Sequence, residues 1–200
     1  MFALVESGSI TKYLNGNKGI TIGDNQYPRA IYTLWTEAER NAIGIYSIVY
    51  DDSNKEDDRW YINTNQSYAF ANGKVTATYG TATAKAHADT TWTAQDETDG
   101  KGTEGEVATR GLKYNLIRDV KAQAADELAR TDWYITRKAE KSTAIPSAIT
   151  THRNLVRSRQ AAMETSITNA SDTPALETLY TYTEDSDGVV SRPLAEIPNL

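Results

Sequence analysis

Few residues of this sequence have the types and spacing that catalysis requires. The chain contains two histidines, His87 and His152, and no cysteine. The histidines lie far apart in sequence, and neither stands near the serine and carboxylate partners that general-base or nucleophilic catalysis uses. His152 falls within an expected helix, where a packing or surface position is the simpler interpretation. We therefore expect no catalytic residue and interpret the protein as non-enzymatic.

Patterns for phosphate, metal and glycan chemistry are incomplete. There is no Gly-x-Gly-x-x-Gly or Walker-type sequence, and the glycines at 100 and 102 lie in a polar, acidic stretch. The acidic run 51–58 resembles a calcium loop, but its sixth residue is Glu56, where an EF-hand needs glycine. We interpret residues 185–188 as a turn, because the later glutamate of a calcium loop is missing. The sequence thus predicts no cofactor and no metal. A facing carboxylate pair for glycan hydrolysis is an open alternative, since acids are abundant.

Composition favours a folded protein and disfavours nucleic acid as its main partner. Of the 200 residues 39% are hydrophobic, and the 12 tyrosines and 4 tryptophans can fill a sizeable core. The net charge of -6 makes nucleic acid an unsuitable main partner, because phosphate binding needs a concentrated positive surface. We expect no secretory signal, and no apolar run approaches the roughly 20 residues that span a bilayer. We therefore expect neither nucleic-acid binding nor membrane insertion.

The fold class expected from these patterns is α+β, and residues 1–92 form its antiparallel β-rich domain. Short strands are expected at 2–5, 20–22 and 43–50, where β-branched and aromatic residues gather. Asn72-Gly73 separates two alternating runs and predicts a hairpin. The aromatic residues of this half are expected mainly in the core, and a protein-binding or sugar-stacking surface is the alternative for a few of them.

The second half has helical periodicity. We expect a linker at 93–106 and a helical module, a hairpin or small bundle, at 107–180. Its long helices are predicted at 107–129 and 147–169, followed by a short helix that begins at 173–174. Residues 181–200 are predicted to form an extended C-terminal tail that docks on a partner. Deleting residues 191–200 should then weaken partner binding more than it lowers the melting temperature.

Three segments resemble proteins from the tail gene clusters of tailed bacteriophages, especially phages of marine bacteria. Residues 27–46 are similar to the "Tyr-Pro…Leu-Trp…Glu…Gly-Ile-Tyr" opening of small tail-fibre and tail-assembly proteins. The stretch Thr131-Asp132-Trp133-Tyr134, with 135–138, 145–146 and 151–157, resembles a module of tail-fibre assembly chaperones and related phage proteins. The helix through 163–170 often continues that module. The resemblance covers about half of the chain, and His152 departs from it, because such modules often carry an aromatic residue there.

The chaperone-like module also has a physical interpretation. Asp132 is expected to cap a short helix by accepting a backbone N–H, and Trp133 to anchor that helix to the long helices. Pro146 can start the next helix, where its missing N–H costs nothing. Three arginines are the candidates for partner binding, since arginine is enriched at interfaces: Arg137, Arg153 and Arg157. Arg153 and Arg157 are four residues apart and should present one charged face.

The resemblance implies a virion structural protein of the phage tail, made in the host cytoplasm. It would act as a tail-fibre or tail-attachment adaptor, binding other tail or fibre proteins in a symmetric homo-oligomer. One alternative is a tail-fibre assembly chaperone that does not stay in the virion. A fibre-borne glycan hydrolase is the other.

Overall fold

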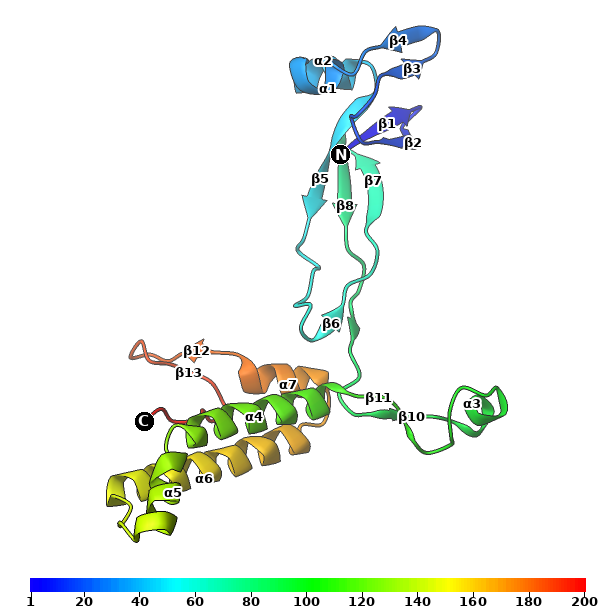
Figure 1. Ribbon diagram of the computed structural model, residues 1–200. Helices are drawn as coiled ribbons and strands as arrows, with labels where there is room; N and C mark the ends of the chain where they lie inside the picture. The colour runs from blue at the N-terminus through cyan, green and yellow to red at the C-terminus, as the bar shows by residue number, and fades with distance from the viewer. The chain divides into compact units, whose positions relative to one another are not determined.

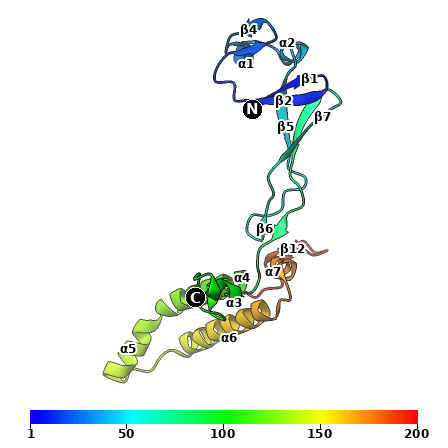
Figure 2. The same ribbon diagram turned by 90° about the vertical axis from the view of Figure 1, so that its right-hand side faces the viewer.

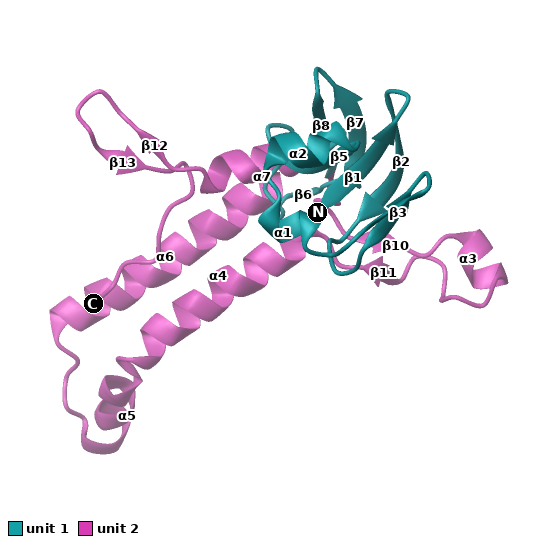
Figure 3. Ribbon diagram, turned by 90° about the horizontal axis from the view of Figure 1, so that it is seen from above, with its two compact units in different colours: residues 1–83 teal, residues 84–200 magenta.

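A computed structural model describes residues 1–200 and divides them into two compact units, Met1–Thr83 and Ala84–Leu200 (Figures 1 and 3). The α+β class is confirmed: the first unit holds a β-sheet and the second holds the long helices. The division falls at Thr83, earlier than the expected end at 92. Residues 85–87 belong with the helices because their carbonyls accept hydrogen bonds from the side chain of Thr173 and from the N–H groups of Leu112 and Lys113.

A five-stranded sheet with the order β2-β1-β5-β8-β7 forms the centre of the N-terminal unit. Its strands are β1 (Phe2–Glu6), β2 (Ser9–Leu14), β5 (Ile45–Asp51), β7 (Ser67–Ala71) and β8 (Lys74–Thr78). The expectation of an antiparallel sheet holds for every pair except β5 and β8, which are parallel. The chain reverses between β5 and β7 and again at the next turn, so β8 runs in the direction of β5.

The turn residues and the alternating side chains of this unit form the structures that the sequence predicts. The turn between β7 and β8 has positive φ at Asn72 (52°) and Gly73 (72°), so the predicted hairpin is confirmed. Leu4 packs in one apolar cluster, while its neighbours Ala3 and Val5 pack in another, because successive strand residues point to opposite faces. The other elements of the unit are β3 (Ile20–Ile22), β4 (Asn25–Tyr27), α1 (Ile31–Leu34), α2 (Glu37–Ala42) and β6 (Tyr61–Ile62), and β9 (Thr83–Ala84) lies at the boundary.

Two long helices form the core of the C-terminal unit. They are α4 (Leu112–Ala129) and α6 (Ser147–Asn169), which lie side by side (Figures 1 and 2). The expected apolar stripes are buried, with Leu116, Val120 and Ala124 on α4 and Ile149, Val156, Met163 and Ile167 on α6. The first helix begins at Leu112 instead of 107, because β11 (Val107–Thr109) pairs with β10 (Thr90–Thr91).

Shorter elements surround this pair. α5 (Asp132–Lys141) follows α4, and α7 (Thr173–Tyr180) follows α6. The expected linker contains a further helix, α3 (Ala94–Thr98), which begins at a capping box formed by Thr93 and Asp96. Hydrogen bonds from the Thr93 hydroxyl and the Lys101 ammonium lower the pKa of Asp96 to about 2. A polar, glycine-rich stretch thus holds a helix because of its cap.

The C-terminal segment contains the hairpin of β12 (Thr183–Glu184) and β13 (Val190–Ser191). Beyond it the chain has no regular secondary structure and packs on the helices of its own unit. Leu194 is 1% exposed, and its N–H donates to the carbonyl of Leu179 over 2.9 Å. No helix of the chain has both the length and the apolar character that crossing a membrane would need.

Candidate functional site: the short helix after α4

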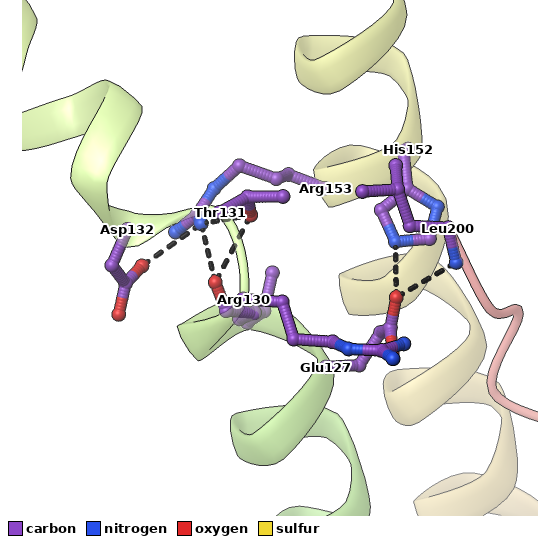
Figure 4. Close-up of polar contacts among 8 residues, drawn as sticks. Glu127, Arg130, Thr131, Asp132, His152, Arg153 and Leu200 are labelled. Atoms are coloured by element: carbon purple, nitrogen blue, oxygen red, sulfur yellow. Dashed lines mark hydrogen bonds and ion pairs between the residues drawn. The ribbon is translucent and has the colours of Figure 1, made fainter.

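The junction between α4 and α5 is held by a buried arginine of α6. The Arg153 Nη1 atom donates to the Leu128 carbonyl over 2.7 Å and to Thr131 Oγ1 over 2.6 Å, and it pairs with Asp132 Oδ1 at 2.8 Å (Figure 4). Arg153 is 7% exposed and Thr131 is fully buried. The Leu128 carbonyl also accepts hydrogen bonds from the Thr131 N–H over 3.1 Å and from the Thr131 hydroxyl over 3.0 Å, so Arg153 is the charged donor among its partners. Arg153 thus joins the end of α4 to the start of α5.

Asp132 does not cap α5, so that prediction is wrong. The residue before the helix is Thr131, and no side chain accepts a capping hydrogen bond. The Thr131 hydroxyl donates to the Leu128 carbonyl instead, over 3.0 Å. Because its carboxylate faces Arg153, Asp132 joins α5 to α6 and still places a negative charge in the first turn of the helix.

Trp133 does not anchor α5 either. Its side chain is 51% exposed, and none of the ten residues of α5 is buried. The indole lies against the ring of Tyr134, with 3.8 Å between centroids, and the Arg137 guanidinium lies 4.6 Å from the Trp133 centroid and 5.2 Å from that of Tyr134. Arg153 holds the helix in place, which leaves Trp133 available at the surface.

One row of α5 combines an aromatic ring with positive charge. Trp133, Arg137 and Lys141 are spaced four residues apart and so follow one face of the helix; we call these three residues the α5 row. Ile135 is also exposed, at 42%. Tryptophan, tyrosine and arginine are the residue types that contribute most often to protein–protein binding. The row can therefore bind a surface that offers apolar side chains and a carboxylate.

A second polar cluster joins the C-terminus to the two long helices. The Glu127 carboxylate accepts hydrogen bonds from His152 Nε2, from Arg130 Nη1 and from the Leu200 backbone N–H, each over 2.9 Å (Figure 4). Burial by itself would raise the pKa of Glu127, which is 6% exposed, but these hydrogen bonds together hold that pKa below its ordinary value. His152 is therefore an interior partner of Glu127.

The remaining predicted residues separate by location. Pro146 precedes α6 directly, so its predicted role is confirmed. Arg157 is exposed and lines a shallow hollow of about 580 Å³ with Leu128 and Gln160. Arg153 and Arg157 do not share one charged face, because Arg153 is directed into the α4–α5 junction. Of the three arginines, Arg137 and Arg157 are available to a partner.

Sequence periodicity contained a signal for both buried polar clusters. Arg153 is four residues after Ile149 and three before Val156, which places it on the buried stripe of α6. Glu127 is three residues after Ala124 on the stripe of α4. A charged residue on an apolar stripe needs a buried partner, and each of these two has one.

Comparison with protein families, with curated proteins and with solved structures finds no match for this chain.

Proposed function

We propose that this chain is a non-enzymatic structural protein of a bacteriophage tail, acting as a tail-fibre or tail-attachment adaptor by binding other proteins. The observation that carries the proposal is α5, a helix with no buried residue that exposes Trp133 and Ile135. The phage context comes from the resemblance of residues 131–138 and 151–157 to tail-assembly proteins. In this role the chain is made in the host cytoplasm and becomes part of the virion, in several symmetric copies among other tail or fibre proteins.

The physical case rests on how α5 is held. A helix of ten residues is marginal in water by itself, and most helical stability in proteins comes from packing. Here packing is replaced by the polar link from Arg153 to residues 128–132. The link fixes the helix in advance, so a partner that covers the α5 row does not need to order it, which favours affinity.

The test compares two exposed aromatic residues that each lie against an arginine. Trp133→Ala removes the centre of the α5 row. Tyr114→Ala is the matched control, because Tyr114 is 44% exposed on α4 and the Arg110 guanidinium lies 4.3 Å from its ring centroid. Phage particles assembled with each variant are purified, and the amount of the chain per particle is measured by mass spectrometry.

We expect Trp133→Ala to reduce incorporation on the order of tenfold, as loss of a central interface residue does. Tyr114→Ala should be incorporated at the wild-type level. Both purified variants should unfold within about 1 kcal/mol of wild type, because Tyr114→Ala loses an exposed cation–π contact and Trp133→Ala loses exposed contacts with Arg137 and Tyr134. Wild-type incorporation of Trp133→Ala would contradict the assignment of α5 as the binding surface.

A further inference from the structure

The β12–β13 hairpin is a second element that exposes apolar residues. All four of its strand residues are exposed, and the adjoining Tyr182 and Val189 are 53% and 56% exposed. Glu184 pairs with Val190 across the ladder, and Tyr182 is two residues before Glu184, so these three side chains share a face. We call Tyr182, Glu184 and Val190 the hairpin face. Because a two-stranded hairpin is marginally stable in water at best, this element gains from being covered.

The hairpin face and the α5 row have opposite charges, and both expose apolar side chains. Residues 183–191 contain Glu184, Asp185 and Asp187 and no basic residue, while Arg192, whose guanidinium lies 5.1 Å from the Tyr182 ring centroid, is paired with Glu196. The α5 row contains two cations, Arg137 and Lys141, while Asp132 of the same helix is engaged by Arg153. The hairpin thus offers a tyrosine, a valine and a carboxylate to a tryptophan and two cations. Such complementarity favours a specific contact.

The two surfaces of one molecule do not cover each other. α5 precedes α6 in the chain, whereas the hairpin follows α7. Figures 1 and 3 show the hairpin and α5 apart. Neither surface is therefore covered by the other one of the same molecule.

We propose that the hairpin face of one copy of this chain docks on the α5 row of a second copy. The proposal rests on the proposed function, because it names the partner of the same α5 surface. The two docking surfaces are different, so the contact is head-to-tail. Repetition of such a contact closes a ring when the rotation allows it and otherwise builds an open chain.

Sedimentation velocity of the full-length chain at increasing concentration tests this arrangement. We expect wild type to form assemblies larger than the 22.1 kDa monomer. Trp133→Ala removes the row, and Glu184→Lys reverses the charge of the hairpin face, so each should weaken association on the order of tenfold or more. Tyr114→Ala and Asp24→Lys make the same kinds of change at exposed positions elsewhere and should associate as wild type does.

Mixing the two defective variants gives the sharpest result. The Trp133→Ala chain keeps its hairpin face and the Glu184→Lys chain keeps its α5 row, so an equimolar mixture should form a 1:1 dimer that does not grow further. The double variant Lys141→Glu/Glu184→Lys exchanges one charge pair between the two surfaces and should associate more strongly than Glu184→Lys alone. Far-ultraviolet circular dichroism confirms that each variant is folded.

Three outcomes would overturn the proposal: a wild-type chain that stays monomeric, variants that associate as wild type does, or a mixture that remains monomeric. If the Trp133→Ala chain is nevertheless lost from particles, the proposed function stands and the α5 row has another tail protein as its partner. If that variant is incorporated normally and the chain is monomeric, both proposals fail.

Discussion

Arg153 holds α5 in place, the role that the sequence analysis predicted for Asp132 and Trp133. We expected Asp132 to cap α5 and Trp133 to anchor it, because those residue types commonly have these roles. The structure replaces both contacts with one guanidinium that reaches Leu128, Thr131 and Asp132. Propensity describes a residue within its own segment, and Arg153 arrives from a helix 22 residues further along the chain than Thr131. This long-range contact is what local patterns could not supply.

The first prediction concerns this arginine. Arg153→Ala leaves the Leu128 carbonyl and the buried Thr131 hydroxyl without their charged partner, so we expect the free energy of unfolding to fall by about 2–3 kcal/mol. The pairing with Asp132 adds little to this, since that carboxylate is exposed. Arg157→Ala, at an exposed position of the same helix, should stay within about 0.5 kcal/mol. Urea unfolding measures both, and equal losses would contradict the role given to Arg153.

The second prediction concerns pH. The pKa of Glu127 is lowered from its ordinary value of 4.5 in the folded protein, so ionised Glu127 stabilises the fold. That contribution is complete above pH 4.5 and is lost as the pH falls through the lowered pKa. Glu127→Gln removes the titrating group. The melting temperature of this variant should therefore fall by less than that of wild type when the pH is lowered from 5 to the lowest value at which the protein is measured. If the melting temperatures of the two proteins fall in parallel over this pH range, ionised Glu127 does not contribute to the stability of the fold.

At the scale of elements, periodic segments could be predicted and short ones could not. α6 spans the residues expected for it, and the Asn72-Gly73 hairpin forms where the turn residues require it. β10 and β11 have two and three residues, too few to show an alternating pattern. Their pairing shortens the expected first helix. The α3 helix was not predicted, because it lies in a polar, glycine-rich stretch. Thr93 and Asp96 nevertheless have the spacing of a capping box.

The C-terminal segment is part of the core of its own unit, which changes the prediction made from sequence. Leu194 is 1% exposed, so Leu194→Ala should lower the free energy of unfolding by about 2–4 kcal/mol through lost burial and a cavity. Val189→Ala, at 56% exposure in the hairpin, should change it by less than about 0.5 kcal/mol. Chemical denaturation followed by tryptophan fluorescence distinguishes the two. A Leu194→Ala protein as stable as wild type would restore the view of residues 192–200 as an arm for a partner.

At the scale of the whole molecule, the change of pattern along the sequence, from short β-type runs to helical periodicity, predicts the α+β class and the order of the two parts. The boundary at Thr83 could not be placed from sequence, because it depends on the carbonyls of residues 85–87 accepting hydrogen bonds from α4 and α7. The exposure of the candidate residues was also predicted only in part: Arg153 is buried, and Trp133 is exposed where an anchor was expected. Surfaces for assembly follow from what the fold leaves uncovered, and that is known only once the packing is known.

The most direct test of the central claim is the number of copies of this chain in purified phage particles. Quantitative mass spectrometry against peptides of a tail protein of known copy number gives that ratio. The account predicts a fixed, stoichiometric ratio that persists through gradient purification of the particles. A chain that is abundant in infected cells and absent from purified particles would contradict the structural role and identify a chaperone that leaves after assembly.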